Sequence, residues 1–212
     1  MPVRVVLGAT ALVRPRVRDV ALAFAEDGHC QPFWSDGIIA EVDRRLPADL
    51  SRATRDYLFA ELERAFPEAR VTWPATVLRE VPYVVDPAET HMMSVALLSH
   101  ADAVVTQTPS LADALEQVDV EPWTVDAFVT FVLDAAPEAA QRTLLRMVRR
   151  RWLPPRPDTS EPPDTSEPPD TSEAHAPTDA ELLGRLSEWA GRALGASSAG
   201  LLAAYADEAR FG

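Results

Sequence analysis

The chain has 212 residues and a mass of 23.2 kDa, enough for one α/β domain with an appendage but short for two full domains. Its 47% hydrophobic content is typical of a globular protein, and no apolar run reaches the ~20 residues that a membrane-spanning helix needs. Cys30 is the single cysteine, which excludes an internal disulfide and a cysteine-based zinc site. We therefore expect a cytoplasmic protein without membrane association.

The net charge of −13 argues against a nonspecific grip on nucleic-acid phosphates, because such binding depends mainly on cations. The charge is unevenly spread along the chain. Eight acidic residues and no lysine or arginine lie between Pro157 and Gly184, which leaves −5 for the rest. The acidic character therefore belongs mainly to one segment.

The first half of the chain alternates between strand and helix patterns. Val3–Leu7 is a short apolar run, typical of a buried parallel strand. Helix patterns follow, of which the second has Ser35 as its N-cap. The expected elements after the first strand are the helices 19–27, 35–46 and 53–66 and a brief strand at 70–73.

The second half continues the alternation, with Thr124 as an N-cap and Pro137 opening a later helix. The expected helices are 89–99, 111–117, 124–134 and 137–152, and the expected strands are 103–106 and 118–122. Two further helix patterns, 179–194 and 198–209, predict a C-terminal helical hairpin.

A tandem repeat of Pro-Asp-Thr-Ser-Glu-Pro runs from Pro157 to Glu173. It has few groups to bury and many prolines, so we interpret it as a disordered or polyproline-II spacer; a phosphorylation target is the alternative. The sequence thus divides into an α/β domain at 1–152, a spacer at 153–178 and the hairpin at 179–212.

Strands separated by helices of this size predict an α/β fold, with a parallel sheet between helices on both faces. In such sheets the functional site lies at the carboxyl ends of the strands. Gly8 and Thr106, which end the first strand and a later central strand, are therefore expected at the site.

Within its first 152 residues the sequence resembles the PIN-domain proteins. The resemblance is to a branch with a Trp-Ser-x-x-Ile-x-x-Glu helix and an Asp-Pro-x-x-x-His helix start. The matching pieces occur in the order of that family and cover about residues 3–152. They are Val5-Val6-Leu7, Arg18-Asp19, Phe33-Trp34-Ser35 through Glu41, Phe66-Pro67, Asp86-Pro87 through His91, Val104-Val105-Thr106 and Thr124 through Phe128.

The resemblance implies a PIN-like three-layer sandwich and metal-dependent RNA cleavage, commonly as the toxin half of a bacterial toxin–antitoxin pair. In that family four acidic side chains hold one or two Mg²⁺ or Mn²⁺ ions. Hard divalent cations require oxygen ligands, and the bound ion activates water and positions the scissile phosphate. The trailing helices also resemble the C-terminal part of that branch, and relatives often form dimers.

Carried over position by position, the acidic motif is incomplete. The first acid falls on Gly8 and the fourth near Leu111, neither of which offers a side-chain ligand. The second and third fall on Glu41 and Glu89. The resemblance therefore implies a degenerate metal site with weak or absent Mg²⁺ or Mn²⁺ binding.

Two neighbouring acids are alternative ligands. Asp86 lies three residues before Glu89, and Asp113 two residues after Leu111. We expect catalytic roles for Glu41, Glu89 and Asp86, with Asp113 as a fourth metal ligand.

Glu41 and Glu89 also have a purely structural interpretation. Glu41 is placed to pair with Arg44 or Arg45 on its own helix, and Glu89 complements a helix dipole. Arg14, Arg16 and Arg18 form a basic loop after the first strand. This loop is either a nucleic-acid site that binds RNA phosphate or an ordinary solvated loop.

Three hypotheses about function follow. The first is a PIN-like protein with a degraded metal site, a weak or inactive ribonuclease that binds an antitoxin-like protein or RNA. The second is an active Mg²⁺- or Mn²⁺-dependent endoribonuclease toxin. The third is a protein-interaction scaffold that works through the acidic spacer and the hairpin.

Overall fold

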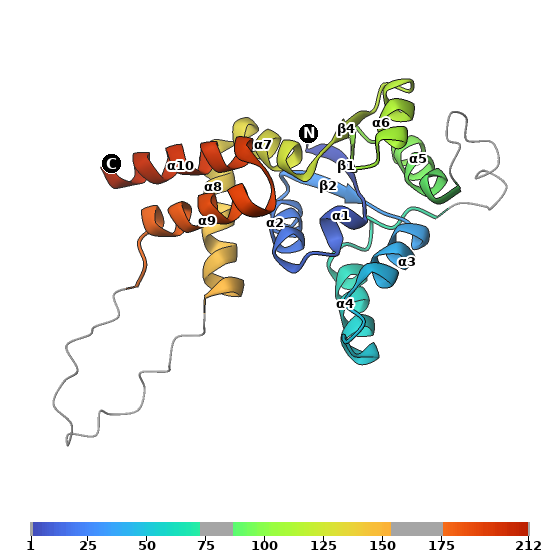
Figure 1. The fold of residues 1–212 in the computed structure, drawn as a ribbon, viewed down its shortest axis with the longest axis horizontal. Coiled ribbons are helices and arrows are strands. Elements are labelled where there is room, and N and C mark those ends of the chain that lie inside the picture. Colours follow the sequence, from blue (N-terminus) through green and yellow to red (C-terminus); the bar gives the residue numbers. More distant parts are fainter. Residues whose placement is uncertain (1, 73–86, 154–175, 212) are drawn as a thin grey trace, which may run out of the picture.

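The structure, a computed structural model, describes residues 2–72, 87–153 and 176–211. These residues form an α/β fold whose parallel sheet has the strand order β2-β1-β3-β4 (Figure 1). The elements are β1 (Val3–Leu7), α1 (Ala9–Leu12), α2 (Pro15–Glu26), β2 (Cys30–Phe33), α3 (Asp36–Arg45), α4 (Arg52–Ala65), α5 (Pro87–Ser99), β3 (Ala103–Val105), α6 (Pro109–Glu116), β4 (Glu121–Trp123), α7 (Val125–Ala135), α8 (Pro137–Met147), the π-helix η2 (Val148–Trp152), α9 (Asp179–Ala193) and α10 (Ala196–Phe211).

The two central strands, β1 and β3, form the core of the sheet. Val5, Val6 and Leu7 pair in parallel with successive residues of β3, and all six partners have no exposed surface. Such strands are covered on both faces, which explains why they are continuous apolar runs in the sequence. The expected parallel sheet between helices is confirmed.

Each of the two outer strands carries a proline, Pro32 in β2 and Pro122 in β4. Proline cannot donate a ladder hydrogen bond and is tolerated at sheet edges. The sequence pattern did not predict β2, because four residues with a proline and a glutamine give no strand signal. It also placed the last strand at 118–122, whereas β4 begins at Glu121.

Residue Arg70 makes a single parallel bridge to Trp34, beside β2, so the brief strand expected at 70–73 is reduced to one contact. The last residue of that expected strand lies outside the described residues.

Cys30 begins β2 and is buried, and burial raises the pKa of its thiol to about 12. A thiol with that pKa is a poor nucleophile at neutral pH.

Hydroxyl side chains start several helices as the sequence indicates. The Ser35 hydroxyl accepts a hydrogen bond from Ile38 N at 3.2 Å, and the Thr124 hydroxyl accepts one from Ala127 N at 3.0 Å. The helix expected from residue 19 instead begins at Pro15, whose fixed backbone suits a first helical position. The four-residue α1 is too short to give a periodic pattern.

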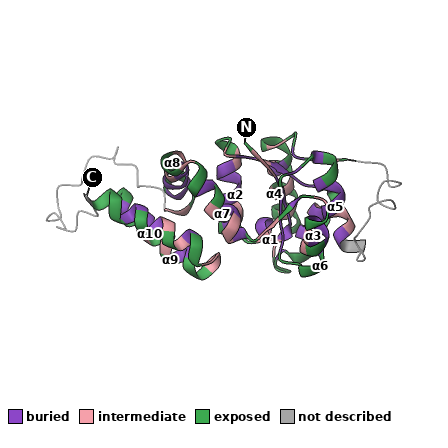
Figure 2. Cartoon of the chain, turned by 90° about the horizontal axis from the view of Figure 1, so that it is seen from above, coloured by how far each residue is buried: buried purple, intermediate pink, exposed green. Residues whose placement is uncertain are grey.

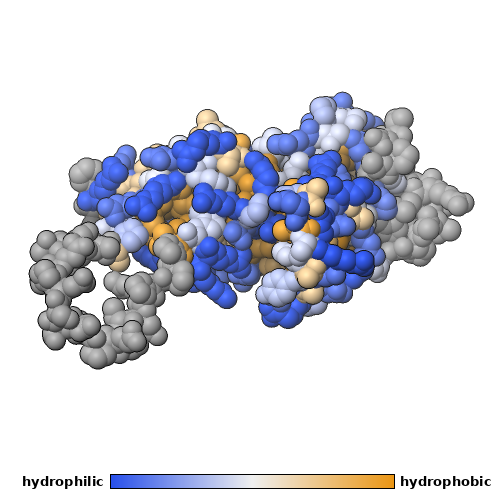
Figure 3. Space-filling view, turned by 60° about the horizontal axis from the view of Figure 1, so that its bottom comes forward, coloured by the Kyte–Doolittle hydropathy of each residue, from blue (hydrophilic) through white to orange (hydrophobic). Residues whose placement is uncertain are grey.

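The sheet lies between two helical layers. Figure 2 shows α2 and α7 on one side of the sheet and α5 on the other. Beyond the first layer, α9 and α10 lie side by side and pack on α8 and α7 (Figure 1). Hydrophilic side chains cover most of the face that Figure 3 presents, with apolar side chains in narrow strips between them. Within the described ranges, no helix has the length and apolarity to cross a bilayer.

Candidate functional site

The carboxyl edge of the sheet is formed where β1 and β3 end together. Leu7 pairs with Val105, so Gly8 and Thr106 follow at the same edge. Thr106 directs its hydroxyl at the next turn, where it accepts a hydrogen bond from Thr108 N at 3.1 Å. The expected juxtaposition of Gly8 and Thr106 is therefore present.

Gly8 lies in a closely packed position rather than an open pocket. Its backbone is extended, with φ −71° and ψ 173°, so glycine is not required for its conformation. A Cβ atom there would lie 2.6 Å from the carbonyl oxygen of Val105 and 2.8 Å from Cε of Met92. Because backbone occupies this space, no acidic side chain fits at Gly8 without a shift of the strands.

Glu89 lies in the first turn of α5 and is 8% exposed. The Ser110 hydroxyl, from the first turn of α6, lies 3.0 Å from each of its two carboxylate oxygens. No ion pair among the described residues includes Glu89. Among the described residues, this buried carboxylate is therefore stabilised by a hydroxyl rather than by a cation.

The fourth acid of the motif falls near Leu111, and the way α6 packs decides which residue there faces the site. Leu111 has no exposed surface and belongs to the hydrophobic core, so it cannot be a site residue. The preceding residue, Ser110, faces Glu89 instead. Sequence reasoning missed Ser110 because the motif alignment pointed one residue further along. Asp113 is exposed, and its backbone carbonyl accepts a hydrogen bond from the Gln117 side chain.

Glu41 is engaged within its own helix. Its carboxylate lies 2.5 Å from the Arg45 guanidinium, in an i,i+4 pair, and its side chain is 22% exposed. This matches the structural interpretation of Glu41 as the partner of a neighbouring arginine. Asp86, the other acid proposed for the site, lies outside the described residues.

The described residues do not fit a divalent metal centre of the PIN type. No group of three or more histidine, cysteine, aspartate or glutamate side chains that could hold an ion is found among them. Glu41 pairs with Arg45, Glu89 accepts from Ser110, and Asp113 is exposed. The Gly8 position is sterically closed. Among the described residues, the acid at this edge is one buried carboxylate next to the Ser110 hydroxyl.

Helices α3 and α5 approach closely beside this edge. A Cβ atom on Gly37 would lie 2.5 Å from the His91 ring, so glycine is needed for the contact between the two helices. His91 therefore packs against α3.

The three arginines of the expected basic loop contact the chain itself. Arg14 donates to the carbonyl of Ala193 at 2.7 Å, and Arg18 donates to the carbonyl of Leu12 at 2.8 Å. Burial lowers the pKa of the Arg18 guanidinium, against the opposing effect of the adjacent Asp19. Arg14 therefore contacts the end of α9, and Arg18 contacts the end of α1.

Arg16 differs from the other two, because it faces an aromatic surface. Its guanidinium carbon lies 5.1 Å from the centre of the Trp152 ring, within the range of cation–π contact. The predicted basic loop thus begins α2 and faces η2 and α9.

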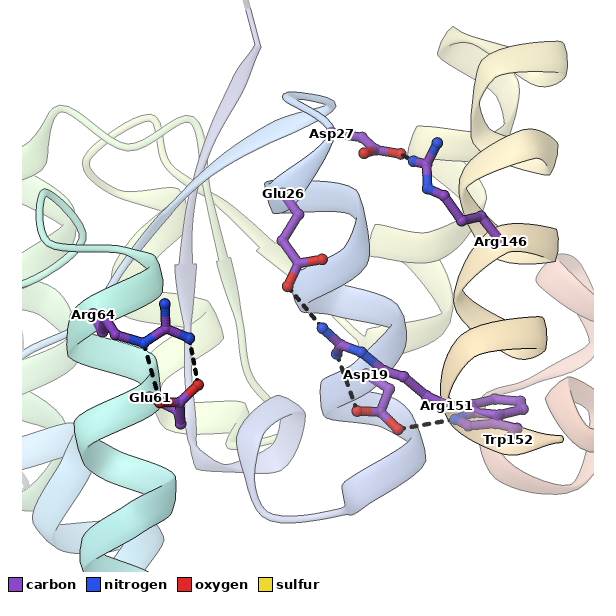
Figure 4. A network of polar contacts seen from close by, with 8 residues as sticks. All are labelled: Asp19, Glu26, Asp27, Glu61, Arg64, Arg146, Arg151 and Trp152. Carbon is purple, nitrogen blue, oxygen red and sulfur yellow. Dashed lines mark hydrogen bonds and ion pairs between the residues drawn. The ribbon is translucent and has the colours of Figure 1, made fainter. Parts of the chain in front are cut away.

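A carboxylate–arginine network connects α2 to α8 and η2 (Figure 4). Arg151 lies 3.3 Å from Asp19 and 2.7 Å from Glu26, and Asp27 pairs with Arg146. Asp19 also accepts a hydrogen bond from the Trp152 indole at 2.9 Å. Asp19, part of the resemblance to PIN domains, therefore serves helix packing in this structure.

Two cavities lined by described residues lie away from the carboxyl edge. One of about 480 Å³ is found at the opposite edge of the sheet, where Arg4, Asp102 and Trp123 line it. A second, of about 250 Å³, lies between η2 and α9.

Comparison of the chain with protein-family models, with curated proteins and with solved structures finds no match.

Proposed function

We propose that this chain is a PIN-like protein of toxin–antitoxin type with a degraded metal site, a weak or inactive ribonuclease that acts by binding. The proposal rests on the ordered motif resemblance and on the place of Glu89. The parallel sheet between helical layers is compatible with it. Binding of Mg²⁺ or Mn²⁺ is weak or absent in this proposal.

The buried carboxylate of Glu89 is the observation that carries the proposal. Glu89 has no cationic partner among the described residues, and burying a carboxylate in this way is costly. An apolar residue at that point would be favoured by stability alone. Its position at the carboxyl edge of β1 and β3 is where open parallel sheets hold ligands. A carboxylate inherited from a metal site explains why an acid remains there.

The missing carboxylates support loss of hydrolysis. Two-metal phosphate cleavage requires several carboxylates that converge on one point. At the Gly8 position the carbonyl of Val105 occupies the space, and at the Leu111 position the side chain belongs to the core. Restoring either acid would therefore disrupt packing before it restored a ligand.

For the partner, we propose an antitoxin-like protein in preference to RNA. The chain is acidic overall, and two arginines of the basic loop donate to backbone carbonyls of the chain itself. Both features reduce the affinity for a phosphate backbone. A homodimer is a further form that the resemblance implies.

The test is a Mn²⁺ titration by calorimetry, with a parallel assay of single-stranded RNA cleavage. We expect the wild-type chain to cleave no faster than the Glu89→Gln variant, with Glu138→Gln as an exposed control. Mn²⁺-dependent cleavage that Glu89→Gln and Glu41→Gln both abolish would instead establish the endoribonuclease.

A second variant tests whether the carboxyl edge is the remnant of the metal site. Ser110→Asp places a second carboxylate beside Glu89 without entering the core, and Ser110→Asn is its neutral control. We expect the aspartate variant to bind Mn²⁺ about tenfold more tightly than the asparagine variant, equivalent to about 1.4 kcal/mol. Equal affinities of the two variants would contradict this placement of the site.

A further inference from the structure

A groove between η2 and α9 combines aromatic and cationic side chains. The rings of Trp152 and Trp189 meet edge to face, with centroids 5.0 Å apart and an interplanar angle of 68°. The cavity beside them has a volume of about 250 Å³. We call it the arginine–tryptophan groove, and its defining residues are Arg16, Arg185, Arg192, Trp152, Trp189 and Leu153.

The arginines of this groove differ from those that surround it. Arg149 pairs with Asp179, and Arg151 pairs with two carboxylates of α2. By contrast, Arg16, Arg185 and Arg192 form no ion pair with any described residue. Of the described residues that line the cavity, Glu188 is the one acid, so this lining is locally positive in a chain of net charge −13.

A guanidinium that forms no ion pair can bind a carboxylate through paired hydrogen bonds. The two indoles add flat apolar surfaces of the kind on which prolines pack in proline-rich recognition. The chemistry of the groove therefore suits a peptide that alternates acidic residues with prolines.

The chain contains such a peptide directly next to the groove. Leu153 lines the cavity and is the last described residue before the Pro-Asp-Thr-Ser-Glu-Pro repeat. The repeat places an acid at every third position and contains no lysine or arginine. These acids are Asp158, Glu161, Asp164, Glu167, Asp170 and Glu173.

We propose that the arginine–tryptophan groove binds the carboxylates of this acidic repeat within the same chain. The length of the connection allows it. Asp158 follows Leu153 by five residues, which span at most ~17 Å. Helix α9, with 15 residues, is ~22 Å long, so successive acids can reach Arg185 and Arg192. The inference is independent of the proposed function.

The covalent connection makes weak contacts effective. A short tether gives an effective concentration of about millimolar, so carboxylate–arginine contacts that would be negligible between separate molecules become populated. Contacts of this kind between exposed groups weaken with salt, because the Debye length falls to ~3 Å at 1 M. Salt dependence is therefore a signature of the proposed binding.

The experiment compares the full wild-type chain with a neutralised variant, in which the six acids of the repeat are replaced by asparagine or glutamine. The readout is the set of tryptophan indole N–H signals in nitrogen–proton correlation spectra. We expect the Trp152 and Trp189 signals to differ between the two proteins at low salt, while the Trp34 and Trp123 signals coincide. About 1 M NaCl should remove the difference.

Arginine variants assign the effect to the groove. Arg16 is left unchanged because its contact with Trp152 would alter the signal by itself. In the Arg185→Gln/Arg192→Gln background, neutralising the repeat should no longer move the two indole signals. In the Arg44→Gln background, where an exposed arginine of α3 without a described ion pair is removed, the full difference should persist.

Three outcomes would overturn the proposal. The first is identical indole signals in the wild-type and neutralised chains at low salt. The second is a difference that survives in the Arg185→Gln/Arg192→Gln background. The third is a difference that disappears on dilution of the protein, which would place the repeat in the groove of a second copy.

Discussion

At the carboxyl edge of the sheet, close apolar packing surrounds the buried contact of Glu89 with Ser110, and Leu7, Val105 and Leu111 are fully buried. On the helical side, α9 and α10 add charged and polar contacts to their apolar packing, among them the pair of Arg149 with Asp179. The first region tolerates little change in shape. The second should respond to charge, pH and salt. This difference explains why the expected catalytic edge is closed while an open cationic groove lies elsewhere.

The largest effect is expected from Leu111→Ala, which removes core volume under the carboxyl edge. We expect a loss of about 3 kcal/mol in the free energy of unfolding, because the transfer and cavity terms add. Urea unfolding followed by circular dichroism measures it. The control is Leu98→Ala, at a side chain that is 44% exposed, where a loss below about 1 kcal/mol is expected. Similar losses for both variants would contradict the core position of Leu111.

A smaller loss is expected from Gly8→Ala, about 2 kcal/mol, because the added methyl group collides with the Val105 carbonyl and with Met92. The matched control is Gly184→Ala in α9, where a Cβ atom meets nothing within 4 Å. That substitution should stabilise the chain by up to about 1 kcal/mol through helix propensity. The two substitutions should therefore have opposite signs in the same unfolding assay. A stabilising Gly8→Ala would show that the edge has room for a side chain.

On the helical side, Asp126 of α7 accepts hydrogen bonds from the start of α10. Ser198 N and Ser197 N donate to its two carboxylate oxygens at 3.0 Å and 3.3 Å, and the Ser198 hydroxyl donates as well. Burial opposes its ionisation, but the hydrogen bonds from the two serines outweigh burial and hold the pKa of Asp126 below its usual range. The carboxylate therefore acts as an N-terminal cap supplied by another helix.

Asp126→Asn should cost about 1 kcal/mol at pH 7, as loss of a cap does. Because the folded-state pKa is depressed, this contribution is present above the unfolded value of about 3.9 and is lost as the pH falls through the folded value. The gap between the wild type and Asp126→Asn should therefore close below about pH 4 in a series of unfolding curves. Asp134→Asn, an exposed change on the same helix, serves as the control. A gap that is constant with pH would exclude the charged cap.

An effect no larger than that of Asp126→Asn is expected from Arg151→Gln, which removes the contacts of η2 with Asp19 and Glu26. With 28% of the Arg151 side chain exposed, we expect a loss of about 1 kcal/mol that shrinks in high salt. Arg142→Gln breaks an exposed pair with Glu138 and should change stability by less than about 0.5 kcal/mol. Equal effects of the two variants would show that the network of Figure 4 adds nothing beyond an ordinary surface pair.

The comparison also shows where sequence reasoning succeeded. Ser35 and Thr124 cap their helices as expected, because capping depends on residues within one turn. The central strands were recognised because burial on both faces leaves an apolar run. β2 and the four-residue α1 were missed, since elements this short carry no periodic signal.

The candidate site was less predictable than the fold. Glu41 and Glu89 lie in the expected helices, but only one of their two contact partners could be predicted from the sequence. Arg45 is a local neighbour and was foreseen as a partner of Glu41, whereas Ser110 lies 21 residues from Glu89 and was not. The two tryptophans of the groove are 37 positions apart in the chain, so their contact gave no signal in the sequence.

By itself, then, the amino-acid sequence determined the alternation of the central strands with helices, the helix starts at Ser35 and Thr124 and the acidic repeat, because each depends on residues near one another in the chain. Only the tertiary structure decided that Gly8 fills a space bounded by Val105, that Leu111 faces the core, and that Arg16 faces Trp152. These facts depend on how distant elements pack against each other. Close packing allows one arrangement of side chains among many that share the same local pattern.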